Sequence, residues 1–226
     1  RFNIAFVIYE KKPLSYNMRL ILNRIKKLGL ITVFGQLIFL VYDKLFLFNS
    51  SKKKISEIFG GEDKEPDIPY METTDLNSPE ILDRVRELKP QVIVVSGASI
   101  LKKPIIQSTP YLINIHCGIS SVYKEVHGVF WAFFRKDEYN LGVTIHLVTP
   151  KVDSGGIIFQ KKTPVFPEDG LHEISAKQYL VGLPLLSQAV SLALENRVER
   201  MQKNQGKGKL WFHPAIWDYL SWSKRK

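Results

Sequence analysis

The sequence predicts an α/β protein built on a doubly wound, Rossmann-like sheet that is mostly parallel and has helices on both faces. Three observations predict this fold class. Segments with strand patterns alternate with segments of helical periodicity, and residues 91–96 contain an unbroken β-branched run that is typical of a buried parallel strand. The chain also has 226 residues, of which 45% are hydrophobic, so it can bury a substantial core. We expect one large domain over residues 1–200 and a short aromatic C-terminal extension over residues 201–226.

Strands are predicted where β-branched and aromatic residues gather or alternate with polar ones. They are residues 2–9, 91–96, 111–116, 142–148 and 156–164. Helices are predicted where apolar residues recur at intervals of three or four. They are residues 15–28, 77–88, 129–136 and 171–196. The last helix is expected to bend near Gly182 and Pro184. The polar stretch of residues 50–74, with Gly60-Gly61 and two prolines, is predicted to be a loop.

The segment from Leu30 to Phe48 is unusually apolar and approaches the length of a membrane span, about 20 residues. Gln36 and the pair Asp43-Lys44 interrupt it, and burying those charges in a bilayer would cost a few kcal/mol. The pattern therefore favours a buried or partly exposed helix. A helix in peripheral contact with a membrane or a partner, and a true span, are the two alternatives.

The net charge is +10, from 32 Lys and Arg against 22 Asp and Glu. Such an excess is typical either of a generally soluble surface or of a site for an anionic ligand. Anionic ligands that fit are a nucleotide-linked sugar, a phosphorylated amine, a tRNA or the glutamate tail of a folate. The basic residues are scattered and form no stripe interleaved with aromatic residues, so dedicated nucleic-acid binding is not favoured. A single cysteine, Cys117, excludes an internal disulfide framework and indicates a reducing, cytoplasmic setting.

Three polar residues form the candidate catalytic group. Asn114 and His116 lie two apart on a predicted strand, so their side chains project from the same face. Asp153 follows 37 residues after His116, in a turn-rich loop that can bring it back toward the end of that strand. An amide, a group that titrates near neutrality and a carboxylate can together move an acyl group without a covalent enzyme intermediate. Cys117 invites a Cys/His nucleophile interpretation, but adjacent strand residues face opposite sides.

The order and spacing of these motifs resemble the catalytic half of the folate-dependent formyltransferases. The matching elements are Asn114-x-His116, a loop as far as Gly128, Gly142-Val-Thr-x-His146 and Asp153-x-Gly-x-Ile157. The family includes glycinamide ribonucleotide formyltransferase, the methionyl-tRNA formyltransferase catalytic domain and the sugar N-formyltransferases. The resemblance implies that 10-formyltetrahydrofolate is the formyl donor and that no metal is needed.

The resemblance also implies a role for each residue of the trio. Asn114 would donate to the formyl oxygen, and His116 as an imidazolium would stabilise the oxyanion and help to relay a proton. Asp153 would hold His116 charged or position a water that carries protons, since a nearby carboxylate raises the pKa of a histidine. His146 is expected to pack within the protein, and His127 either lines a substrate loop or shapes its turn.

The folate site is implied by the resemblance and has little side-chain signature. Family members place the pterin against the backbone of the loop that follows the strand at residues 92–96. In this chain the expected residues are Gly97, Ile100 and Leu101, and Val152 is expected to close the other side.

Departures from the family pattern narrow the acceptor amine. Residues 9–15 lack the Gly-Ser-Asn phosphate loop of the purine enzymes, which disfavours glycinamide ribonucleotide. The loop at residues 117–123 lacks the tRNA enzymes' Ser-Leu-Leu-Pro, and the residues after Pro164 are mostly one helix rather than a β-barrel, which disfavours initiator tRNA. Tyr123-Lys124-Glu125 replaces the Tyr-Arg-Gly often found in the acceptor loop.

The resemblance therefore favours transfer to a nucleotide-linked amino sugar. Formylation of glycinamide ribonucleotide or of a lipid-linked amino sugar at a membrane, hydrolysis of formyltetrahydrofolate and a non-catalytic binding module are the alternatives. The aromatic extension is also compatible with a homodimer.

Overall fold

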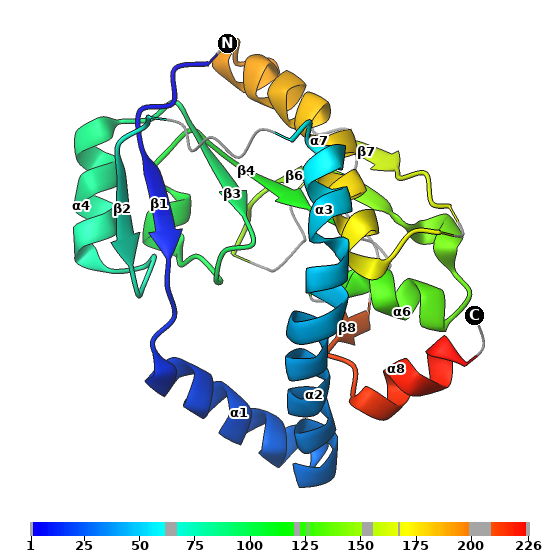
Figure 1. Ribbon diagram of the computed structural model, residues 1–226. Coiled ribbons are helices and arrows are strands. Elements are labelled where there is room, and N and C mark those ends of the chain that lie inside the picture. The colour runs from blue at the N-terminus through cyan, green and yellow to red at the C-terminus, as the bar shows by residue number, and fades with distance from the viewer. Residues whose placement is uncertain are drawn as a thin grey trace.

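The structure is a computed structural model that describes residues 2–61, 67–119, 123–125, 127–150, 156–166, 168–198 and 209–224. Its central sheet has four strands in the order β3-β4-β6-β7 (Figure 1). The strands are β3 (Val92–Ser96), β4 (Tyr111–His116), β6 (Gly142–Leu147) and β7 (Ile157–Lys162). β3 and β4 run parallel, as the β-branched run at residues 91–96 predicts, whereas β6 is antiparallel to both of its neighbours.

Two smaller sheets flank the central one. In the first, β1 (Val7–Glu10) pairs in parallel with β2 (Tyr70–Thr73). In the second, β5 (Tyr123–Glu125) pairs in parallel with β8 (Lys209–Trp211). Among the described residues, three strand pairings are thus parallel and two are antiparallel.

Helices cover both sides of the sheet, which confirms the predicted fold class. They are α1 (Leu14–Leu28), α2 (Leu30–Tyr42), α3 (Phe48–Ile58), α4 (Pro79–Leu88), α5 (Lys103–Ile106), α6 (Gly128–Phe134), α7 (Leu171–Leu194) and α8 (Ile216–Ser223). A π-helical turn, Asp43–Leu47, joins α2 to α3, and a 3-10 turn, Glu138–Asn140, precedes β6.

The two faces of the central sheet pack against different helices. Ile115 of β4 and Val143 of β6 belong to the core that α7 covers. A Cβ atom at Gly182 of α7 would lie 2.7 Å from Val143 Cγ2 and 2.9 Å from Ile115 Cδ1, so the helix approaches the sheet closely there. Leu112 faces the other way and packs with buried residues of α4 and α5. This division fixes which side chains of β4 remain for a site.

The prediction of a loop over residues 50–74 is wrong at both of its ends. Residues 50–58 continue the helix α3, and residues 70–73 form β2. α3 packs against α7, where Ser51 is buried and Lys54 pairs with Glu173 at 3.4 Å. A polar sequence with weak apolar periodicity is helical here because it extends α2 and because tertiary packing outweighs local propensity.

The aromatic C-terminal extension packs onto the rest of the molecule. Trp211 stacks on Trp131 of α6 with ring centroids 4.7 Å apart, and Tyr219 of α8 packs on the buried Phe39 of α2. The indole of Trp217 lies against Gly35, where any side chain would collide with it. The extension thus covers α2 and α6. A homodimer that forms through this extension stays a prediction. The division of the chain into a main domain and a separate extension also stays a prediction.

Candidate functional site

Asn114 and His116 lie on the same face of β4, as their spacing predicts. The antiparallel register of β6 sets Asn114 opposite His146 and His116 opposite Thr144. All four side chains therefore project from the sheet face opposite the one that α7 covers. Strands β4 and β6 thus place one amide, two imidazoles and one hydroxyl on the same face of the sheet.

His146 orients the amide of Asn114. The Asn114 Nδ2 and His146 Nε2 atoms are 3.1 Å apart, and His146 Nδ1 lies 2.9 Å from the carbonyl oxygen of Leu147. Because a carbonyl only accepts, Nδ1 of His146 donates to it, and Nε2 accepts from the Asn114 amide. His146 is buried, with 3% of its surface exposed, so it packs as expected and also positions Asn114. One N–H of the amide stays directed elsewhere and can donate to a ligand oxygen.

Thr144 fixes the backbone that follows His116. Its hydroxyl donates to the carbonyl oxygen of Gly118 at 2.7 Å and accepts from Gln160 Nε2 at 2.8 Å. Thr144 is fully buried, so this pair of hydrogen bonds is shielded from water. The start of the loop after His116 is therefore held in place from β6 and β7.

The Cys117 thiol is unsuited to nucleophilic catalysis. Burial raises its pKa to about 11, against a lowering contribution from a hydrogen bond with Tyr179 of α7. The thiol is therefore protonated at neutral pH, and the thiolate is the reactive form. Tyr179 also lies 3.1 Å from Ser96 Oγ, at the end of β3. Cys117 thus belongs to the packing side of the sheet, next to α7.

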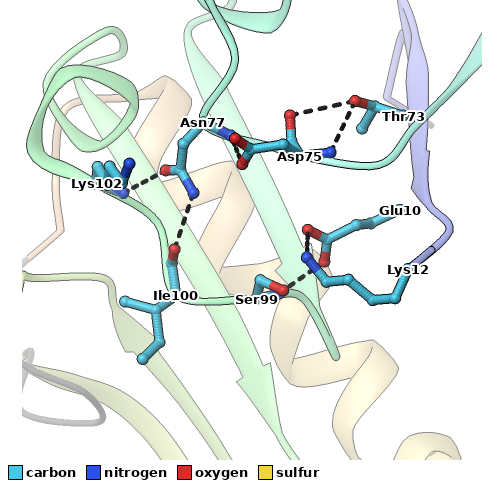
Figure 2. Close-up of polar contacts among 8 residues, drawn as sticks. All are labelled: Glu10, Lys12, Thr73, Asp75, Asn77, Ser99, Ile100 and Lys102. Carbon is cyan, nitrogen blue, oxygen red and sulfur yellow. Dashed lines mark hydrogen bonds and ion pairs between the residues drawn. The ribbon is translucent and has the colours of Figure 1, made fainter. Parts of the chain in front are cut away.

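The predicted pterin loop after β3 is held by a side chain that the sequence did not single out as functional. Asn77 donates from Nδ2 to the carbonyl oxygen of Ile100 at 3.1 Å, and its Oδ1 accepts from the backbone N–H of Lys102 at 2.6 Å (Figure 2). Ile100 is 69% exposed, whereas Leu101 between these two contacts is buried in the core. Gly97 begins the loop with φ of +62°, a conformation that favours glycine.

Glu10 holds the same loop from the end of β1. One carboxylate oxygen accepts from the Ser99 backbone N–H at 3.1 Å, and the other pairs with the Lys12 ammonium (Figure 2). Burial opposes ionisation, but the hydrogen bonds from Lys12 and Ser99 hold the pKa of Glu10 below its usual value. The charged form is therefore the one that the loop binds. The sequence shows Glu10 only as one of the residues that replace the phosphate loop of the purine enzymes.

His127 packs inward against the C-terminal extension. It takes a left-handed backbone conformation, with φ of +58°, and its Nε2 lies 2.6 Å from His213 Nδ1. Burial lowers the pKa of both imidazoles, that of His213 to about 3, so both are neutral at neutral pH. Gln36 of α2 donates to the His213 carbonyl oxygen at 2.7 Å. His127 therefore shapes the turn before α6 and joins it to the extension.

Two predicted site residues, Val152 and Asp153, lie outside the described residues. Within the described ranges, no three His, Cys, Asp or Glu side chains are grouped so that they could hold a metal ion. Two open cavities, of about 340 Å³ and 250 Å³, lie between α3, α8 and the start of α7, away from Asn114 and His116. The candidate site thus lies on one face of the sheet, at the carboxyl end of the inner strand β4, where hydrogen bonds from β6 hold it.

Sequence comparison relates most of the chain to one family. The sequence model of the formyl transferases matches residues 17–190. The methionyl-tRNA formyltransferase of Chlorobium chlorochromatii is 33% identical over 117 residues, which are 51% of this chain and 37% of that protein. The chain spans less than half the length of the curated relatives it matches.

Solved structures share the fold. A sugar N-formyltransferase from a Shewanella species is 18% identical and superposes with a TM-score of 0.55, over 92% of this chain and 75% of that chain. A formyltransferase from Anoxybacillus kamchatkensis, solved in complex with UDP-4,6-dideoxy-4-formamido-L-AltNAc and tetrahydrofolate, is 19% identical. Its TM-score is 0.52, over 70% of this chain and 80% of that chain.

Proposed function

This chain belongs to the formyl transferase family, and on that premise we propose that it transfers a formyl group from 10-formyltetrahydrofolate to a primary amine. The acceptor that we propose is the amino group of a nucleotide-linked sugar. The observation that carries the proposal is the arrangement on β4, where Asn114 and His116 share one face and His146 orients the Asn114 amide. A preorganised N–H donor beside an imidazole is what a tetrahedral oxyanion requires.

The trio would act in sequence on a tetrahedral intermediate. As the amine nitrogen bonds to the formyl carbon, the carbonyl oxygen gains negative charge, and the Asn114 N–H and the His116 imidazolium stabilise it. The attacking nitrogen loses a proton, which Asp153 accepts directly or through a water. The bond from the formyl carbon to the folate nitrogen then breaks, and that nitrogen takes a proton from the His116 imidazolium, which recovers one from Asp153. Because the proton count balances between the two nitrogens, His116 and Asp153 return to their starting forms.

The donor would lie against the loop after β3. Gly97, Ile100 and Leu101 provide its backbone, and Asn77 and Glu10 keep that backbone in one conformation before the ligand arrives. A rigid loop lowers the entropy lost on binding, which favours recognition through backbone groups. We propose Val152 as the residue that closes the opposite side.

The sugar acceptor is supported by three observations. The end of β1 has Glu10 and Lys12 where a glycine-rich phosphate loop would be needed for glycinamide ribonucleotide. The Shewanella sugar N-formyltransferase superposes over 92% of this chain. A nucleotide-linked sugar also suits the net charge of +10, because its pyrophosphate is anionic.

Methionyl-tRNA is the second candidate acceptor. The relative from Chlorobium chlorochromatii carries that function in its name and is 33% identical over 51% of this chain, against 18% over 92% for the Shewanella sugar enzyme. Residues 117–123 lack the loop sequence typical of the tRNA enzymes, which disfavours this acceptor. The two acceptors are distinguished by direct assay.

The test is to mix the protein with 10-formyltetrahydrofolate and a panel of UDP- and dTDP-linked amino sugars. Tetrahydrofolate release is followed together with the mass of each acceptor. A gain of one formyl group on one sugar supports the proposal in full. Formylation of charged initiator tRNA, and of none of the sugars, would replace the proposed acceptor and retain the chemistry.

Release of tetrahydrofolate without any acceptor would identify a hydrolase that uses water in place of the amine. No release with any acceptor would contradict catalysis by this chain. If the protein then bound the folate without turnover, it would be a non-catalytic binding module.

A further inference from the structure

Helix α2 carries a stripe of apolar side chains that stays exposed in the part of the molecule that the structure describes. Ile31, Phe34 and Val41 are 78%, 61% and 59% exposed. We call the full set the apolar stripe, and it consists of Leu30, Ile31, Phe34, Leu37, Ile38 and Val41. These positions fall on one side of a helix with 3.6 residues per turn, so they form a continuous surface. Apolar side chains gathered in this way mark a contact with another surface.

The opposite side of α2 is docked onto the protein. Val33 and Phe39 are buried there, and Gln36 donates to the His213 carbonyl oxygen. The continuous helical segment Leu30–Ile58 is long and apolar enough, by length and composition, to cross a membrane. Crossing would strip α8 and α6 from Phe39 and would expose Gln36 to lipid, so α2 is suited to lie on a surface rather than to pass through it.

The segment around the stripe carries nearly all of the net charge. Residues 11–56 contain ten Lys or Arg and a single acid, whereas the whole chain has a net charge of +10. That acid, Asp43, is turned inward and lies 2.8 Å from His172 Nε2. The cations flank the stripe in sequence on both sides, with Lys26 and Lys27 before it and Lys44 and Lys52 after it.

Helix α1 extends this surface. None of its residues is buried, and Leu14, Met18 and Leu22 recur at intervals of four and are all more than half exposed. In Figure 1, α1 and α2 form an open angle at the edge of the molecule below the sheet. Both helices therefore present apolar rows outside the core that holds the candidate site.

We propose that α2 docks in the plane of an anionic lipid bilayer, with the apolar stripe in the headgroup boundary and the flanking lysines on the lipid phosphates. Exposed apolar residues on one helix face with cations at its margins are the pattern of an interfacial helix. Charge decides against a second copy of this chain as the occupant, because two such cationic segments would repel each other across the stripe. An anionic surface attracts the same segment.

Docking would bring the candidate site close to the membrane. Three residues separate the end of β1 at Glu10 from the start of α1 at Leu14. One of them, Lys12, lies over the Tyr16 ring at 4.6 Å. The carboxyl end of β1 is therefore tied to the helices that would touch lipid. The docking itself does not depend on formyl transfer, and its test needs no substrate.

The test is sedimentation of the purified protein with vesicles of phosphatidylcholine, with and without about 30% phosphatidylglycerol. We expect binding to the anionic vesicles that weakens in high salt. In the variant Phe34→Gln/Ile38→Gln, the bound fraction should fall by about tenfold or more, because two apolar side chains of the stripe are lost. The matched control is Leu180→Gln/Leu183→Gln on α7, whose leucines are exposed to a similar extent, and it should bind as the wild type does.

Three results would overturn the proposal. In the first, the wild-type protein stays in solution with anionic vesicles. In the second, it binds neutral and anionic vesicles equally. In the third, the bound fraction falls equally in the test and control variants. A wild-type dimer that the stripe variant converts to a monomer in the absence of lipid would show instead that a second copy covers the stripe. The melting temperatures of both variants are compared with that of the wild type, and the lipid series on wild-type protein decides the matter if a variant is unfolded.

Discussion

The two faces of β4 differ in chemistry although their residues alternate along one strand. On one face, Asn114 and His116 lie opposite polar residues of β6. On the other, Ile113 and Ile115 pack under α7, and Cys117 directly after the strand meets Tyr179 of that helix. The packed face can thus fix the position of the strand while the polar face remains available for a ligand. Substitutions on the two faces should therefore affect different measurements.

Among substitutions of the residues that surround the polar face of β4, Asn114→Ala is expected to lower kcat strongly. Loss of one oxyanion donor should lower kcat by about 10²–10³-fold, with little change in melting temperature. Tetrahydrofolate release under saturating acceptor measures it. Asn140→Ala is the matched control, because the Asn140 amide donates to Asp137 within the same turn before β6. Equal losses in the two variants would contradict a role for Asn114 in the reaction.

His146 should matter as a positioning residue. In His146→Leu the Asn114 amide loses the acceptor that orients it, and a displaced group can cost about 10²-fold in kcat. His146→Gln keeps an acceptor oxygen and should recover part of the rate, with KM for the donor unchanged in both variants. Full kcat in His146→Leu would show that the Asn114 orientation is set elsewhere.

The packed face should respond in stability. Gly182→Ala places a methyl group against Val143 and Ile115, and such overpacking costs about 1–3 kcal/mol of unfolding free energy. Gly170→Ala is the control, because its Cβ would meet nothing closer than 3.5 Å. Denaturant unfolding measures both variants, and kcat of the folded fraction should stay near that of the wild type. Unchanged stability in Gly182→Ala would mean that α7 is free to shift.

Much of the sheet could be predicted from local pattern. The β-branched run at residues 91–96 is β3, and the alternation at residues 111–116 is β4 with Asn114 and His116 on one face. The helix predicted at residues 77–88 is α4, and Ser78 caps it by accepting from the Ile81 N–H at 3.3 Å. These elements are readable because their periodicity is set by burial on one side.

Other features depend on contacts between distant segments. α3 is polar and gains its support from α7, so its own sequence indicates a loop. Asn77 and Glu10 hold the loop after β3 from two other elements, and only the three-dimensional fold brings them together. The pairing of His127 with His213 joins residues 86 positions apart. No local pattern carries such information.

The most direct test of the roles assigned to the two faces of β4 compares His116→Asn with Cys117→Ala, because these neighbours belong to opposite faces of the same strand end. Single-turnover formyl transfer is measured for both, together with affinity for the folate. We expect a loss of about 10³-fold or more for His116→Asn with folate affinity retained, and a near wild-type rate for Cys117→Ala. Retained turnover in His116→Asn, or an equal loss in Cys117→Ala, would contradict it.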